Sequence, residues 1–289
     1  MIKILVTGSK SYVGTSLKKW LGQWPNKYSV DFISLRNDEW KNRDFFEYDV
    51  LFHTVAIVHK KEKPEMKGLY YKINRDLTVE VAKKAKKEGV KQFIFMSSMS
   101  VYGLNGKIGE AVIITKDTPC NPNTFYGKSK LEAESELKKI EDRQFRVAII
   151  RAPMVYGPNC PGNYTRLKKL VMKTPVFPLI NNKRSMIFID NLCEFIKLLI
   201  DNKDHGLLFP QNKGYVNTSE LIRLIAKENS KKIYFSRILT YVINFFGKKI
   251  SVFNKVFGNL VFDLDLSSYR DFKYCVVDLE RSVEICEKE

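Results

Sequence analysis

A tyrosine and a lysine stand four positions apart in the segment Tyr126-Gly127-Lys128-Ser129-Lys130, at the start of an expected helix. Side chains at this spacing share one helix face, so the phenol and the ammonium are neighbours. A tyrosine titrates near pH 10, at about the value for the free side chain, and a nearby cation favours the phenolate. The pair is therefore predicted to donate and accept a proton near neutral pH.

A hydroxyl group is predicted close to this pair. The apolar run Phe95-Met96-Ser97-Ser98 ends in two serines at the carboxyl end of an expected strand. Ligands of open α/β sheets bind beyond this edge, where Ser98 could hold the oxygen of a substrate alcohol or carbonyl.

A glycine-marked turn follows the first expected strand in Thr7-Gly8-Ser9-Lys10-Ser11-Tyr12-Val13-Gly14. Such a turn lets backbone N–H groups and a helix N-terminus face a pyrophosphate. The outer two of three usual glycines are present, and Ser11 replaces the middle one. Where the second strand ends, Arg36 stands in place of the acidic residue typical of NAD sites, and Lys10 adds a second cation. The sequence favours NADP(H) and leaves NAD(H) open.

The elements that position these residues alternate along the chain. We expect strands at residues 2–7, 30–35, 50–55, 93–97 and 147–150. Helices are expected after Gly14, with Leu17, Trp20, Leu21 and Trp24 on one face, and at 72–87, 126–140, 192–200 and 219–226. Strands that alternate with helices predict a doubly wound α/β domain, in which helices cover both faces of a parallel sheet.

Composition limits the class of protein. The 289 residues suit one large domain or two modest ones, and a net charge of +17 favours anionic partners. The five cysteines and three histidines show no zinc-site spacing, so no metal is expected. No apolar run approaches about 18 residues, and the N-terminus enters a strand pattern at once. We therefore expect a cytoplasmic protein without a membrane span, and no recognised nucleic-acid module is present.

The chain resembles the extended short-chain dehydrogenase/reductases of the NAD-dependent epimerase/dehydratase family, which act on nucleotide sugars. The resemblance covers nearly the whole chain. It rests on residues 7–14, Asp49-Val50-Leu51-Phe52-His53-Thr54-Val55-Ala56, Asn74, Ser97-Ser98-Met99-Ser100-Val101-Tyr102-Gly103, Tyr126 with Lys130, Arg151-Ala152-Pro153-Met154-Val155-Tyr156-Gly157-Pro158 and Arg184-Ser185-Met186-Ile187-Phe188-Ile189-Asp190.

The resemblance implies a division of labour among residues. A Rossmann-like NAD(P) domain would span 1–157 and a smaller C-terminal substrate-binding lobe 158–289, with part of 184–201 returning to the first domain. Ser98, Tyr126 and Lys130 would form the catalytic triad, with Lys130 also bonding the nicotinamide ribose. Further implied cofactor contacts are Gly8, Lys10, Ser11, Tyr12, Val13, Gly14, Arg36, Ala56 and Asn74, and implied substrate contacts are Ser98, Met99, Asn163 and Arg184. A homodimer is also implied.

Departures from the family pattern narrow the reaction. Met99 and Ser100 replace the Asp-Glu pair of the 4,6-dehydratases, so dehydration is disfavoured; Met99 also replaces the Cys of GDP-fucose synthases, and Met154 the Asn of typical 4-epimerases. The chain looks most like capsule-cluster enzymes, so we expect NADPH-dependent reduction of a UDP-4-keto-6-deoxy-N-acetylhexosamine in surface polysaccharide synthesis. The alternatives are a UDP-N-acetylglucosamine or UDP-glucose 4-epimerase with tightly bound NAD, and a non-catalytic nucleotide-binding protein.

Two features have structural interpretations. Residues 227–256 carry seven Lys or Arg against one acid, interleaved with apolar residues. They are interpreted as substrate-lobe helix with a buried apolar face, in preference to a peripheral membrane contact. His53 and His59 are interpreted as core or loop histidines without a catalytic role.

Overall fold

The computed structural model describes residues 1–58 and 62–288, which form two compact units. The first unit comprises Met1–Gly103, Pro119–Ala152 and Cys193–Phe209, and the second comprises Leu104–Thr118, Pro153–Leu192 and Pro210–Glu289. Each unit is therefore assembled from three separate stretches of chain. A functional division into a cofactor domain over 1–157 and a substrate lobe over 158–289 stays a prediction.

A six-stranded parallel sheet forms the centre of the first unit. Its strand order is β10-β6-β4-β3-β1-β2. The bounds are β1 Ile2–Thr7, β2 Tyr28–Ile33, β3 Val50–His53, β4 Gln92–Ser98, β6 Arg146–Ala152 and β10 Gly206–Leu208. The inner strands are short apolar runs because both of their faces are covered. The expected α/β class with a parallel sheet is confirmed.

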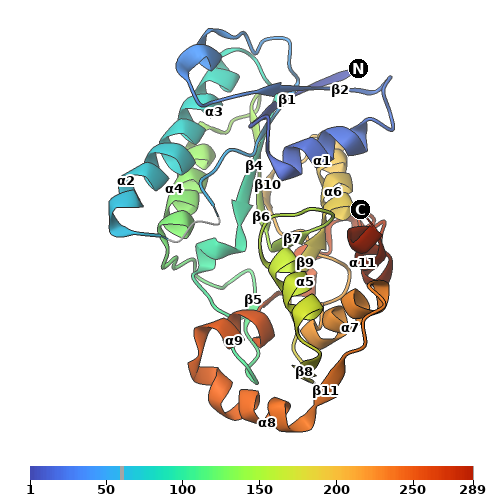
Figure 1. Cartoon of the computed structure of the whole chain (residues 1–289). Coiled ribbons are helices and arrows are strands. Elements are labelled where there is room, and N and C mark those ends of the chain that lie inside the picture. Colours follow the sequence, from blue (N-terminus) through green and yellow to red (C-terminus); the bar gives the residue numbers. More distant parts are fainter. Residues whose placement is uncertain (59–61, 289) are drawn as a thin grey trace. The chain divides into compact units, whose positions relative to one another are not determined.

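Helices cover both faces of this sheet. The helices α1 (Tyr12–Leu21) and α6 (Ile189–Asn202) lie on one face, while α2 (Lys67–Tyr71), α3 (Leu77–Lys87) and α4 (Phe125–Ile140) lie on the other (Figure 1). The expected helix after Gly14 is shorter than predicted, because it ends at Leu21 with Gly22 as its C-cap. Trp24 therefore lies outside α1, although the spacing placed it on the helix face.

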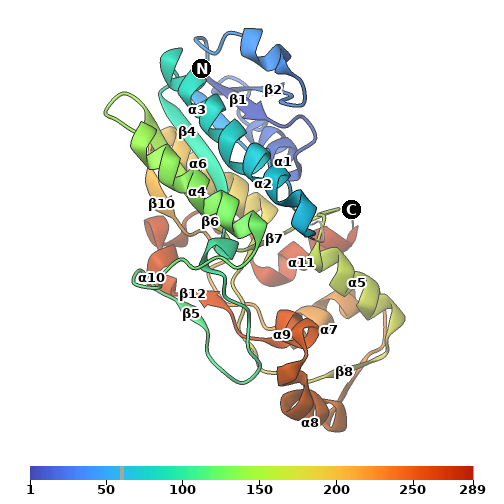
Figure 2. The same cartoon turned by 90° about the vertical axis from the view of Figure 1, so that its left-hand side faces the viewer.

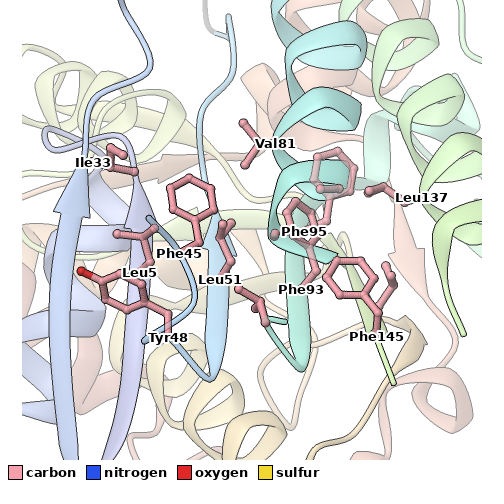
Figure 3. Packing of buried hydrophobic residues seen from close by; sticks show 14 of the residues in the cluster. Leu5, Ile33, Phe45, Tyr48, Leu51, Val81, Phe93, Phe95, Leu137 and Phe145 are labelled. Atoms are coloured by element: carbon pink, nitrogen blue, oxygen red, sulfur yellow. The ribbon is translucent and has the colours of Figure 1, made fainter. Parts of the chain in front are cut away.

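The core of the first unit lies between the sheet and the helices α3 and α4. Strand residues and helix residues interdigitate there, with Phe45 and Tyr48 closing the end beside β1 (Figure 3). Fully buried members include Leu5, Leu51, Phe93, Phe95, Val81 and Leu137. This packing fixes α4 against β4, the two elements that carry the predicted catalytic residues.

A π-helical turn interrupts the helix expected at 72–87. Residues Lys72–Asp76 form this turn between α2 and α3, and Asn74 within it is fully buried. Wider turns of this kind are frequent at functional sites, because they aim a side chain where a regular helix would not.

The second unit consists of helices and short parallel strand pairs. The helix α7 (Thr218–Glu228) packs against α5 (Asn163–Lys173) and α11 (Leu279–Lys288). The strand pairs are β7 (Met154–Tyr156) with β9 (Met186–Phe188), β8 (Val176–Pro178) with β11 (Tyr234–Ser236), and β5 (Ile113–Ile114) with β12 (Val261–Phe262). The remaining helices are α8 (Arg237–Phe246), α9 (Ser251–Phe257) and α10 (Leu264–Ser267) (Figure 2).

One expectation fails in this unit. The apolar side chains of α8 were predicted to be buried, but most of them are exposed, including Ile238, Tyr241 and Phe245.

Short 3-10 turns occur in both units, at Asp38–Asn42, Pro64–Met66, Met99–Tyr102, Gly247–Lys249 and Tyr269–Phe272. Within the described part of the chain, no helix combines the length and apolar character that crossing a bilayer requires.

Candidate active site

Ser98 and Tyr126 meet at the carboxyl end of β4. Ser98 is the last residue of β4, and its Oγ accepts a hydrogen bond from the backbone N of Ser100 at 3.1 Å. Tyr126 lies in the first turn of α4 and its side chain hydrogen bonds with that of Ser98. A Cβ at Gly127 would come within 2.5 Å of the Ser100 carbonyl oxygen, so only glycine lets α4 approach this closely. The structure therefore brings together two of the three predicted catalytic residues.

Lys130 lies one helical turn further along α4 and is only 1% exposed. Its Nζ donates to the backbone oxygen of Met96 at 2.8 Å and lies 4.4 Å from the centre of the Phe95 ring. Burial lowers the pKa of Lys130 to about 7, against an opposing effect of Glu134. A lysine with this pKa changes charge in the physiological range, as catalytic lysines do.

The predicted effect of Lys130 on the phenol is wrong in this structure. Burial raises the pKa of Tyr126 to about 12, and the hydrogen bond with Ser98 only partly opposes it. The ammonium of Lys130 is bonded to the Met96 carbonyl, so its charge is not committed to the phenol. At neutral pH Tyr126 is thus protonated and can donate its proton to an alkoxide; a positive charge brought next to the ring would favour the reverse transfer.

Glu62 holds the N-terminus of α4, a role that the sequence did not reveal. Its two carboxylate oxygens accept hydrogen bonds from the backbone N of Phe125 and of Tyr126, at 2.8 and 2.9 Å. Thr124 completes the cap, because its Oγ1 accepts from Gly127 N at 3.0 Å. An anionic group here also complements the positive end of the helix. Glu62 therefore positions the backbone that carries Tyr126.

A buried ion pair lies behind the catalytic face of α4. Arg151 binds Glu134 through Nη2 at 2.6 Å, and its Nη1 donates to the Tyr102 hydroxyl at 2.8 Å. Ser97 donates to the same carboxylate. Glu134 and Arg151 are 1% and 5% exposed, so both charges depend on each other for solvation. Glu134 is on α4 and Arg151 on β6, so spacing along the helix did not reveal this pair.

The glycine turn has the form that a pyrophosphate site needs. Ser11 caps α1, and its Oγ accepts from Gly14 N at 3.2 Å. A Cβ at Gly14 would come within 2.8 Å of Val6 Cγ1, so glycine allows α1 to start directly against β1. Gly8 follows β1, Lys10 is exposed in the turn, and Tyr12 and Val13 begin the helix. These residues fit a dinucleotide, and their contacts with one stay a prediction.

The other predicted cofactor residues lie along the same sheet edge. Asn74 Oδ1 accepts from Ile57 N at 2.7 Å, and its Nδ2 donates to Ser129 Oγ at 3.1 Å. Asn74 thus ties the segment after β3, which contains Ala56, to helix α4. Arg36 is exposed three residues beyond the end of β2. A cofactor role for Asn74 would therefore be one of positioning, and the roles of Ala56 and Arg36 stay predictions.

His53 is a core residue, as interpreted from the sequence. Its Nδ1 lies 3.1 Å from Thr7 Oγ1 and its Nε2 lies 3.0 Å from Thr78 Oγ1. Burial lowers the pKa of His53 to about 3, so the ring is neutral. His59 lies outside the described residues.

The predicted substrate residues fall in both units. Met99 follows Ser98 in the first unit, whereas Asn163 and Arg184 belong to the second. Asn163 is the first residue of α5. Arg184 Nη1 donates to the Gly258 carbonyl at 3.1 Å, and burial lowers the pKa of its guanidinium. Their binding to a diphosphate stays a prediction.

The parallel sheet, the glycine turn and the Ser98–Tyr126–Lys130 arrangement define a dinucleotide-binding α/β enzyme. Residues 4–209 match the NAD dependent epimerase/dehydratase family, and the chain belongs to that family. It is an enzyme of the nucleotide-sugar epimerase/dehydratase type.

The relatives whose activity is named are mainly 4-epimerases. The chain is 32% identical to a UDP-glucose 4-epimerase of Vibrio cholerae over 90% of this chain and 87% of that one. It is 29% identical to the N-acetyl-α-D-glucosaminyl-diphospho-ditrans,octacis-undecaprenol 4-epimerase of Escherichia coli O157:H7, over 78% and 68%. A UDP-glucuronic acid 4-epimerase from Bacillus cereus, solved with NAD, has a TM-score of 0.74 at 20% identity and covers 99% of this chain and 96% of its own. This last similarity supports the fold.

Proposed function

We propose that this protein is a nucleotide-sugar 4-epimerase, which oxidises C4 of a UDP-linked hexose or N-acetylhexosamine and reduces it again from the other face. The observation that carries the proposal is the meeting of Ser98 with Tyr126 at the end of β4, with a buried Lys130 on the same helix. The similarity to named 4-epimerases over most of the chain supports this choice over the ketoreductase expected from the sequence.

Each residue has a defined part in the reaction. Ser98 holds the C4 oxygen by a hydrogen bond, and Tyr126 takes the proton of the C4 hydroxyl on oxidation and returns it on reduction. Taking that proton requires the phenolate, so in the oxidation step the Lys130 ammonium would turn from the Met96 carbonyl towards the phenol and lower its pKa. A bound nicotinamide cofactor supplies the hydride acceptor and donor, and the glycine turn with α1 is the place that holds its pyrophosphate.

The substrate diphosphate would be bound by the second unit. Arg184 is a partly buried cation, and Asn163 starts α5, where anions are favoured. A UDP-linked amino sugar remains the preferred substrate, with a role in surface polysaccharide synthesis.

The test is interconversion of unreacted UDP-sugars by the purified protein. We expect UDP-N-acetylglucosamine or UDP-glucose to equilibrate with its C4 epimer without net consumption of added cofactor, as followed by NMR. The Tyr126→Phe protein is the matched control and should lose about a hundredfold or more of the rate, the usual contribution of a positioned acid–base group. Absence of interconversion with both sugars would contradict the epimerase proposal.

A 4-ketoreductase is the second candidate, favoured by Met154, which stands where typical 4-epimerases have Asn. Its test uses the 4-keto product of a UDP-N-acetylglucosamine 4,6-dehydratase. Rapid, stoichiometric loss of NADPH absorbance with this compound, without epimerisation of unreacted sugars, would establish the reductase instead.

Arg36 tests the choice of cofactor. If its guanidinium binds a 2′-phosphate, Arg36→Ala should weaken NADPH binding by about tenfold or more and leave NADH binding unchanged, because a charge-assisted hydrogen bond contributes about 1.5–3 kcal/mol. Fluorescence titration of both cofactors measures this. An equal loss for both cofactors, or none, would remove the basis for NADP(H), and the cofactor would then be NAD(H), which the solved relative contains.

A further inference from the structure

Helix α8 exposes an apolar surface for which the proposed reaction has no use. Ile238, Tyr241 and Phe245 are 80%, 81% and 73% exposed, and they follow one another at helical spacing. Val242 and Phe246 extend this surface, which we call the α8 patch. Contiguous exposed apolar side chains of this kind mark an interaction surface in soluble proteins.

The helix is fixed to its unit by the opposite face. Ile243 is buried there, and the Thr240 hydroxyl accepts a hydrogen bond from Leu179 N at 2.7 Å. Ser236 caps the N-terminus of α8, with its Oγ accepting from Leu239 N at 3.2 Å. The side of α8 opposite the α8 patch is therefore packed against the second unit, and the patch itself faces outwards.

Charge around the α8 patch indicates what it binds. Residues 229–262 contain six Lys or Arg and no Asp or Glu. Arg237 begins α8, and the exposed Lys248 and Lys249 follow its end, with Lys255 on α9. The carboxylate of Glu110, in the loop of residues 104–118, is already paired with Lys107 at 3.0 Å, so it does not neutralise these cations. Exposed apolar and aromatic side chains flanked by cations are the pattern of helices that lie in the headgroup region of an anionic membrane.

A second copy of this chain fits the α8 patch less well. A symmetric dimer through it would place Arg237, Lys248 and Lys249 of both copies around one interface, with no acid from this segment to compensate. We propose that the α8 patch docks the enzyme onto an anionic lipid bilayer, with Ile238, Tyr241 and Phe245 inserted among the headgroups. This proposal is independent of the reaction catalysed.

The test is co-sedimentation of the full chain with vesicles of phosphatidylcholine, alone or mixed with about one third phosphatidylglycerol. We expect tight binding to the anionic vesicles, weakened by high salt because screening reduces the attraction of exposed charges. Ile238→Ser/Phe245→Ser should bind at least about tenfold more weakly, because each apolar side chain contributes through burial. Lys248→Gln/Lys249→Gln should also lose about 25-fold, since each of the two cations contributes about fivefold near such a surface.

Phe46→Ser is the matched control, because Phe46 is 72% exposed but lies outside the α8 patch. It should bind anionic vesicles as the wild type does. The lysine pair changes only exposed side chains, so this variant keeps the test valid if the apolar variant misfolds. Wild-type binding no stronger to anionic than to neutral vesicles would overturn the proposal. So would a change from dimer to monomer in Ile238→Ser/Phe245→Ser with unchanged vesicle binding, which would instead assign the α8 patch to self-association.

Discussion

Replacing Lys130 by Met should abolish turnover and at the same time make the protein more stable. The pKa of Lys130 falls from 10.5 to about 7 on burial, so the folded state pays for holding its charged form. Each pKa unit corresponds to about 1.4 kcal/mol, and the lost hydrogen bond to Met96 offsets about 1 kcal/mol. We expect a net gain of about 3 kcal/mol in the free energy of unfolding near pH 7, and a loss of about a hundredfold or more in kcat.

The pH dependence gives this prediction a sign. Below pH 7 the lysine is charged in both states and its burial is most costly; between about 7 and 10.5 the unfolded chain keeps a proton that the folded chain has released. The free energy of unfolding of the wild type therefore rises relative to that of Lys130→Met as the pH increases through this range. Urea unfolding at pH 6.5 and pH 9.5, about the two ends of it, measures the difference. A variant that is less stable than wild type at both pH values would contradict the burial argument.

Replacing Arg151 by Met should cost the first unit about 3–5 kcal/mol of stability. The substitution leaves the carboxylate of Glu134, 1% exposed, without its counter-charge. The double variant Arg151→Met/Glu134→Leu removes both charges and should recover most of the loss. Urea unfolding of the two single variants and the double variant gives the coupling energy directly.

An exposed ion pair on the same helix serves as the control. Arg75 binds Glu132 of α4 at 2.7 Å, but these side chains are 34% and 45% exposed. Arg75→Met should therefore cost less than about 1 kcal/mol. Similar losses for Arg75→Met and Arg151→Met would show that burial does not control the contribution of the Arg151–Glu134 pair.

The sequence predicted the fold of the first unit well because its signals are local. The apolar run of β1, the turn at Gly8 and the helix after Gly14 follow from neighbouring residues, and so does the alternation that makes the sheet parallel. Trp24 was misplaced, because its helical spacing continues past Gly22, where the helix ends. The exposure of α8 could not be predicted, since an apolar helix looks the same in sequence whether its neighbours cover it or not.

The candidate site was predictable in its residue types and less so in its electrostatics. Ser98 and Tyr126 do meet, as their motifs imply. Whether the pKa of Tyr126 is raised or lowered depends on its burial and on where the ammonium of Lys130 points. Spacing along a helix determines neither of these. Glu62 lies 64 residues from Tyr126 in sequence, so no local pattern connects the two.

Each unit is assembled from three separate stretches of chain, and this affects how the protein folds during its synthesis. The strand β10 pairs with β6 only after residue 208 has left the ribosome, and β5 waits for its partner β12 at residues 261–262. The sheet that carries the catalytic residues is thus completed only after 208 of the 289 residues, while residues 104–118 remain without their partner until near the end. Pairings so distant along the chain fold slowly and leave strand edges open meanwhile. Chaperones that shield nascent chains should therefore raise the yield of this protein more than that of a chain whose domains are contiguous.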